Sequence, residues 1–140
     1  MLRPIFLTLA TAAAMAVVSG AQAQEPALNG VWRNPKDSVH VDLRPCGAGL
    51  CGYVVWASPK AQADAHKAGT ESLVGSQLLR DFSQEKSGVW RGRVFVPDLN
   101  ATFRGTAELI DGKSMRAKGC LIANMLCKSQ IWTRVEIPAG

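Results

Sequence analysis

Short runs of alternating apolar and polar residues, separated by turn-forming residues, cover most of the chain after residue 30. In residues 39–45, for example, three apolar side chains alternate with His40, Asp42 and Arg44. A period of two places the apolar side chains on one face of a strand, as in a half-buried antiparallel sheet. The chain is therefore expected to fold as an all-β domain.

Eight strands are predicted from these runs. In chain order they span residues 30–34, 39–45, 50–57, 74–82, 89–96, 101–110, 113–121 and 126–137. Asp111-Gly112, between the sixth and seventh strands, is a strong signal for a two-residue hairpin turn. The stretch Ser58–Ser72 breaks the pattern because it is polar and rich in alanine, and we expect either a short helix or a loop there.

Eight short antiparallel strands favour a closed up-and-down β-barrel or a β-sandwich, and we favour the barrel because closure removes exposed strand edges. The interior of an eight-stranded barrel is just wide enough for its own side chains or for one small ligand. Small residues occupy several of the predicted inward positions: Gly92, Gly105, Ala107, Ala117 and Gly119. Such residues either let the strands bend or leave a cavity.

The first 23 residues have the order of a cleavable secretory signal peptide. Arg3 precedes an apolar run from Ile5 to Val18, and the small residues that follow end in Ala21-Gln22-Ala23. The run is shorter than the roughly 20 residues that span a bilayer, and no second long apolar run predicts a membrane span. Cleavage after Ala23 would leave residues 24–140 as a single domain in the periplasm or outside the cell.

The charge of the chain is modestly positive, with 16 Lys and Arg against 11 Asp and Glu. These basic residues are scattered along the sequence, which is typical of a solvated surface and not of a nucleic-acid site. We therefore expect no nucleic-acid partner. A positive charge still allows weak attraction to an anionic envelope surface.

Four cysteines follow the predicted signal peptide, at positions 46, 51, 120 and 127. An even number of cysteines in a small exported domain favours disulfides. Zinc is the competing interpretation, but the spacing and the lack of a nearby histidine argue against a metal site. Of the three pairings that four cysteines allow, we favour Cys46–Cys51 and Cys120–Cys127, because each pair would bracket a hairpin turn.

Two motifs at the ends of the predicted barrel resemble those of lipocalin-type proteins. Gly30-Val31-Trp32 is similar to the Gly-x-Trp that opens the first strand of that superfamily, and Trp132-Thr133-Arg134 lies on the last predicted strand. In lipocalins a basic side chain of the last strand stacks on the first-strand tryptophan and closes the barrel. The resemblance implies that Arg134 stacks on Trp32, a cation–π contact worth about 0.5–2 kcal/mol.

Most of the chain after residue 24 also resembles a family of small exported bacterial proteins, catalogued as a domain of unknown function, number 2147. The matching stretches are Gly30-Val31-Trp32, Leu50-Cys51-Gly52, Leu73-Val74-Gly75, Gly88-Val89-Trp90-Arg91-Gly92 and the tail from Gly119 to Arg134. The chain departs from the family pattern between Ser58 and Ser72. The resemblance implies a lipocalin-like barrel and an envelope location, with no established activity.

Candidate catalytic groups are sparse in this sequence. His40 and His66 are its two histidines, and neither a Gly-x-Ser-x-Gly elbow nor a phosphate-binding glycine motif occurs. Asp64 and His66 supply only two ligands on one loop, too few for a metal site. We therefore predict no catalytic residue, no metal and no cofactor, and the protein is not expected to be an enzyme.

Aromatic and large apolar residues are the best candidates for a function, although most of them should fill the core. Four of them are predicted to line an apolar pocket: Trp56, Trp90, Phe103 and Met115. The leading hypothesis is a binding protein that holds a small apolar or amphipathic ligand inside the barrel. The alternative is a protein–protein interaction module, an inhibitor or an envelope-stress factor, that acts through the Cys46–Cys51 loop and Ser58–Ser72.

Overall fold

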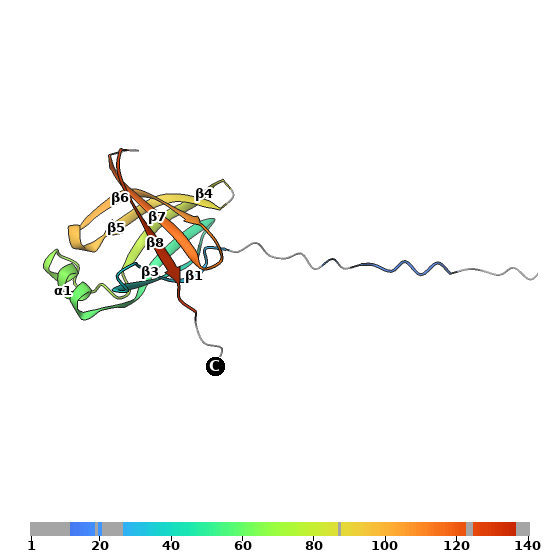
Figure 1. Ribbon diagram of the computed structural model, residues 1–140, viewed down its shortest axis with the longest axis horizontal. Coiled ribbons are helices and arrows are strands. Elements are labelled where there is room, and N and C mark those ends of the chain that lie inside the picture. The colour runs from blue at the N-terminus through green and yellow to red at the C-terminus, as the bar shows by residue number, and fades with distance from the viewer. Residues whose placement is uncertain (1–11, 19, 21–26, 87, 123–124, 137–140) are drawn as a thin grey trace, which may run out of the picture.

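The computed structural model describes residues 12–18, 20, 27–86, 88–122 and 125–136. Eight antiparallel strands form a closed barrel in which each strand pairs with the next and β8 returns to β1 (Figure 1). The strands are β1 (Gly30–Arg33), β2 (Val39–Cys46), β3 (Gly49–Ala57), β4 (Gln77–Lys86), β5 (Val89–Val96), β6 (Ala101–Leu109), β7 (Ser114–Ile122) and β8 (Met125–Arg134). The prediction of an all-β, eight-stranded up-and-down barrel is confirmed. Among the described residues, no helix is long and apolar enough to cross a membrane.

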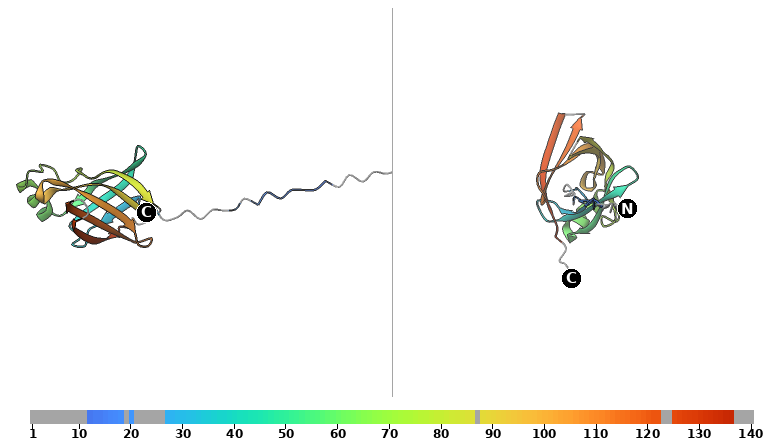
Figure 2. Two further views of the ribbon diagram at one scale, coloured as in Figure 1. Left: turned by 90° about the horizontal axis from the view of Figure 1, so that it is seen from above. Right: turned by 90° about the vertical axis from the view of Figure 1, so that its right-hand side faces the viewer.

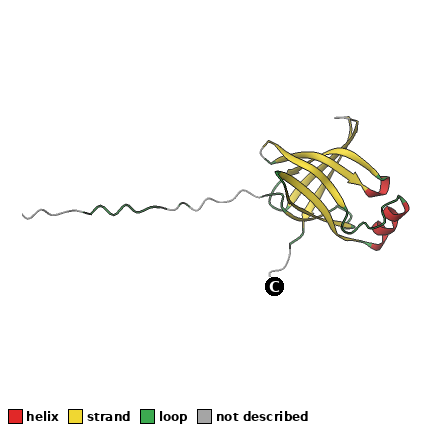
Figure 3. Cartoon of the chain, turned by 180° about the vertical axis from the view of Figure 1, so that it is seen from behind, coloured by secondary structure: helices red, strands yellow, loops and turns green. Residues whose placement is uncertain are grey.

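The connection between β3 and β4 contains a short helix, α1 (Pro59–Lys67). Ser58 caps it, because its hydroxyl oxygen accepts a hydrogen bond from the Ala61 amide at 3.1 Å, and proline suits the first helical turn. The helix buries Ala65 and lies beside the 3₁₀ helix η1 (Pro97–Leu99) at one end of the barrel (Figure 3). Of the two expectations for Ser58–Ser72, the helix is the one observed.

The fourth strand begins later than predicted, at Gln77 instead of residue 74. The preceding residues form a turn in which the Ser76 amide donates to the Leu73 carbonyl at 3.0 Å. Gly75 has a φ of 93°, a conformation that favours glycine and does not occur in an extended strand. The apolar residues Leu73 and Val74 therefore belong to this turn, where Leu73 is buried.

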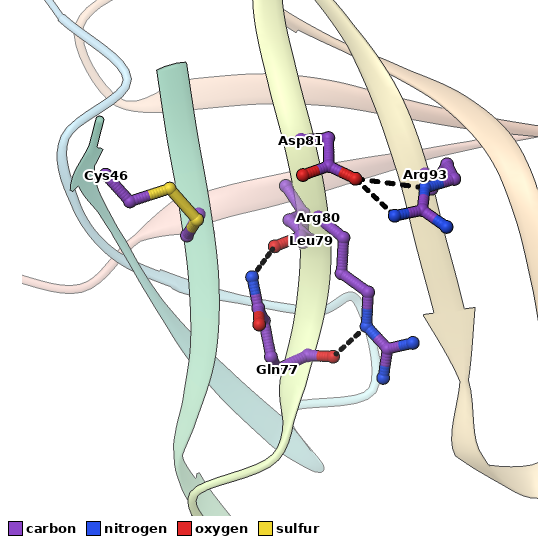
Figure 4. Close-up of polar contacts among 7 residues, drawn as sticks. Cys46, Gln77, Leu79, Arg80, Asp81 and Arg93 are labelled. Carbon is purple, nitrogen blue, oxygen red and sulfur yellow. Dashed lines mark hydrogen bonds and ion pairs between the residues drawn. A yellow bond between two sulfur atoms is a disulfide. The ribbon is translucent and has the colours of Figure 1, made fainter. Parts of the chain in front are cut away.

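A bulge in β4 directs Phe82 into the barrel. Leu79 faces inward, and plain alternation would place Asp81 inside as the next inward residue. Asp81 instead has a φ of 53°, and the pairing between β4 and β5 shifts register at this point. Asp81 consequently forms an ion pair with Arg93 on the outer surface, as Figure 4 shows, and the Phe82 ring lies against Gly92.

The buried core lies mainly beside β1 to β4. Its largest fully buried side chains are Trp32, Phe82, Leu43, Val41 and Val54. Burying a side chain of this kind contributes about 1.5–3 kcal/mol. By contrast, the described side chains of β8 are exposed from its start to Ile131 and only partly buried beyond it. The interior is therefore least covered on the side of β8.

The seam between β1 and β8 is short, with only two residue pairs: Trp32 with Arg134, and Arg33 with Thr133. The Arg134 guanidinium lies 4.3 Å from the centre of the Trp32 ring. It also donates hydrogen bonds to the Asn29 carbonyl at 2.6 Å and to the Ala27 carbonyl at 2.7 Å. Arg134 therefore joins the first and last strands, in the position that the lipocalin resemblance implies.

Two disulfides link the cysteines in the local pairing favoured from the sequence, Cys46–Cys51 and Cys120–Cys127. The first spans the turn between β2 and β3, and the second joins directly paired positions of β7 and β8. Disulfides persist in oxidising compartments, so they indicate a protein that functions outside the cytoplasm. The predicted cleavage site after Ala23 lies outside the described residues.

Candidate functional site

Small residues predominate in the transverse rows that form the inner face of β5, β6 and β7. The three strands pair in continuous register, and directly paired residues share one face of the sheet. The two central rows are Trp90–Ala107–Ala117 and Gly92–Gly105–Gly119. Five of the six positions in these two rows are therefore glycine or alanine, and the exception is Trp90.

The three glycines of the second row have different surroundings. A β-carbon on Gly92 would lie 2.5 Å from the Phe82 ring, and one on Gly105 would lie 2.6 Å from a methyl group of Val94. A β-carbon on Gly119 would meet no atom within 4 Å. Two of the glycines thus permit close packing, whereas open space lies over the third.

This open space is bordered by polar side chains of β8. Gly119 pairs with Lys128 and Ala117 pairs with Gln130, so both polar side chains share the inner face. The Trp132 indole nitrogen donates a hydrogen bond to the Gln130 side-chain oxygen at 3.3 Å. The site therefore combines a small apolar floor with an amide and an ammonium group. Lys128 and Gln130 could not be recognised as site residues from the sequence, because a polar residue on an inward face contradicts the usual pattern.

The predicted pocket residues do not form one cluster. Met115 is buried in the core, and Trp90 is partly buried in the row next to the glycines. Phe103 pairs with Val94 on the other side of the glycine row. It lies four residues from Ala107, the partner of Trp90, which corresponds to roughly 13 Å along the strand. Trp90 and Phe103 thus flank the glycine row from opposite sides.

Trp56 lies on the outer surface and not in the predicted pocket. Its side chain is 43% exposed, and its ring centre is 4.6 Å from that of His40. Alternation from the buried Val54 would have placed Trp56 inside the barrel. The pairing of β2 with β3 shifts register between His40 and Val41, and this irregularity reverses the direction of the residues that follow Val54.

The candidate acid–base and metal-binding groups lie apart from the inner face. His40 Nε2 is 2.6 Å from a carboxylate oxygen of Asp37, and this hydrogen bond lowers the pKa of Asp37. Asp64 forms an ion pair with Lys60 at 2.6 Å along α1. Within the described part of the chain, no three His, Cys, Asp or Glu side chains are grouped as a metal site requires.

The two loops considered as protein contact surfaces lie at opposite ends of the barrel, because β3 connects them. Large exposed apolar side chains are instead concentrated at the tip of the β7–β8 hairpin: Leu121, Ile122, Met125 and Leu126. The sequence carries a signal for this surface, since the apolar residues between the last two cysteines do not alternate with polar ones.

The family model described as "Uncharacterized protein conserved in bacteria (DUF2147)" matches residues 30–134. The chain belongs to this family. The match begins at the first residue of β1 and ends at Arg134, so the DUF2147 unit is the complete barrel, including both sides of its seam.

A solved structure of similar fold is protein HP1028 from the human pathogen Helicobacter pylori, which is described as a member of the lipocalin family. The TM-score is 0.65 at 10% sequence identity, and the match covers 80% of this chain and 85% of that chain. No curated protein matches the sequence. At this identity the likeness shows that the DUF2147 barrel has a lipocalin-like fold.

Proposed function

We propose that the protein is a non-enzymatic carrier that binds a small apolar or amphipathic ligand against the inner face of β5 to β8. The observation that carries the proposal is the open space over Gly119, in a barrel whose other inward glycines are closely packed. Eight-stranded barrels can hold one small ligand, and the lipocalin-like fold is compatible with this use.

The side chains around the open space suggest the class of ligand. Ligand sites are mostly apolar, with a few polar groups that fix orientation. Here Ala117 and Gly119 form the floor, while Lys128 and Gln130 lie on the neighbouring strand. An amphiphile with an anionic head group fits this arrangement, because the ammonium group of Lys128 would pair with the head group and the apolar part would lie on the floor.

The proposal can be tested by filling the open space. Gly119→Leu places a branched side chain there, and Gly119 does not adopt the left-handed conformation that only glycine tolerates well. Native mass spectrometry of the exported protein should detect a bound amphiphile, and this variant should lose it. Ser129→Leu is the matched control, because Ser129 pairs with Lys118 on the opposite face of the same two strands.

Two results would contradict the proposal. One is a wild-type protein that carries no ligand and takes up none from a panel of fatty acids and lysolipids. The other is a Gly119→Leu variant that retains the ligand with the same affinity as the wild-type protein.

A further inference from the structure

The tip of the β7–β8 hairpin exposes four large apolar side chains: Leu121 (59%), Ile122 (59%), Met125 (67%) and Leu126 (68%). Ile122 pairs directly with Met125, and alternation places Leu121 on the face opposite to Ile122. The apolar residues therefore occupy both faces of the hairpin and cannot all pack on the barrel. Figure 2 shows that the hairpin extends beyond the neighbouring strands.

Basic residues surround this apolar tip. The segment from Ser114 to Arg134 contains four basic residues and no Asp or Glu. Lys118 and Lys128 are the two nearest the tip, and their pairing places them on opposite faces of the hairpin. Arg104 of β6 adds a third cation, because it pairs with Cys120 at the base of the tip.

We propose that this tip docks the protein on an anionic lipid membrane. Apolar groups of interfacial proteins enter the membrane by about 5–10 Å, and basic groups gain attraction from anionic head groups. Lys128 lies three residues from Met125, or roughly 10 Å, and Lys118 lies four residues from Ile122, or roughly 13 Å. When the apolar tip is inserted, both ammonium groups are therefore at the level of the lipid phosphates.

The charge of the hairpin favours a lipid surface over a second copy of the chain. Two identical tips in contact would bring together the basic residues Lys118, Lys128 and Arg104 of both copies, and like charges repel. An anionic membrane instead neutralises Lys118, Lys128 and Arg104 while it buries the apolar side chains. Lys128 belongs to both sites, but Lys118 and the tip lie outside the inner face around Gly119, so variants of these residues test membrane binding separately from the ligand site.

The Cys120–Cys127 disulfide fits this role. An isolated two-stranded hairpin is at best marginally stable in water. Here β7 pairs with β6 only up to Cys120, so among the described residues beyond this point β7 and β8 pair only with each other. The disulfide lies at the base of this segment and keeps the apolar tip together without support from the rest of the barrel.

Vesicle flotation of the exported protein tests the proposal. We expect the protein to float with phosphatidylcholine vesicles that contain phosphatidylglycerol, to float poorly with phosphatidylcholine alone, and to dissociate as salt is raised. Met125→Ser/Leu126→Asn should weaken binding about tenfold per side chain. Asparagine is suitable because Leu126 has a φ of 54°, which asparagine tolerates better than most residues.

A second variant and a control make the result specific. Lys118→Gln should weaken binding about fivefold without removing any apolar contact. Ile110→Ser is the matched control, because Ile110 is 47% exposed in the turn between β6 and β7, at the opposite end of β7 from the tip, and its replacement should leave binding unchanged.

The proposal is overturned if the wild-type protein floats with neither type of vesicle. It is equally overturned if the Met125→Ser/Leu126→Asn and Lys118→Gln variants both bind as tightly as the wild-type protein. It is also overturned if Ile110→Ser lowers binding as much as the double variant does. A wild-type dimer that the double variant abolishes, with no vesicle binding, would assign the tip to a second copy of the chain instead.

Discussion

Replacement of Arg134 by alanine tests how the barrel is held closed. The guanidinium lies over the Trp32 ring and donates hydrogen bonds to three backbone carbonyls, of Ala27, Asn29 and Gly112. Two of these carbonyls precede β1 and the third lies in the turn between β6 and β7. One side chain therefore connects three separate segments of the chain across a seam that has only two residue pairs.

The expected loss of stability follows from these contacts. A cation–π contact is worth about 0.5–2 kcal/mol. A hydrogen bond from a charged donor contributes about 1.5–3 kcal/mol when buried, but Arg134 is partly exposed, so water replaces much of this loss. We expect Arg134→Ala to lower the free energy of unfolding by about 2–4 kcal/mol. The free energy of unfolding of Arg134→Lys should lie between those of Arg134→Ala and the wild type, because lysine keeps the positive charge but lacks the planar guanidinium group with its several N–H donors.

Urea unfolding followed by tryptophan fluorescence and circular dichroism measures this difference. Arg104→Ala is the control, because Arg104 is an exposed arginine on β6, away from the seam. It should change the free energy of unfolding by less than about 0.5 kcal/mol. If Arg134→Ala is as mild as this control, the seam does not depend on Arg134 and the reasoning is refuted.

Three further predictions concern the inner face and one turn. Gly92→Ala should destabilise the protein by about 1–3 kcal/mol in urea, because its methyl group would overlap the Phe82 ring, whereas Gly119→Ala should be nearly neutral. Lys128→Gln should weaken the calorimetric affinity for an anionic amphiphile about tenfold and leave a neutral apolar ligand unaffected. The backbone amide of Lys113 donates a hydrogen bond to the Asp111 carboxylate and lowers its pKa. The stability that this hydrogen bond contributes is present above the usual carboxyl pKa and is lost as pH falls through the lowered value. Asp111→Ala should remove this part of the acid dependence of thermal unfolding.

The sequence predicted the wall of the barrel well wherever neighbouring strands pair in continuous register. The inward and outward residues of β5, β6 and β7 follow plain alternation, and so the glycine row could be placed on the inner face before the structure was known. The hairpin between β6 and β7 was predictable from Asp111-Gly112, but its connection has four residues, 110–113, and is not the two-residue turn expected.

Irregular pairing limited the prediction of the site. The register shift beside His40 sends Trp56 outward, and the bulge at Asp81 sends Phe82 inward. Such irregularities depend on how two paired strands fit together, so alternation along one strand does not reveal them. The open space over Gly119 was also unpredictable, because it depends on which side chains of other strands fill the interior.

The two disulfides have a topology with a consequence for how the molecule moves. Each links neighbouring strands within one hairpin, β2 to β3 and β7 to β8. Neither crosses the β1–β8 seam, so no covalent bond among the described residues holds the first and last strands of the barrel together. Proteins open locally at their least supported contacts, and the sheet can unroll from this seam while both hairpins stay intact. We therefore expect local opening along the β1–β8 seam to expose the interior without global unfolding.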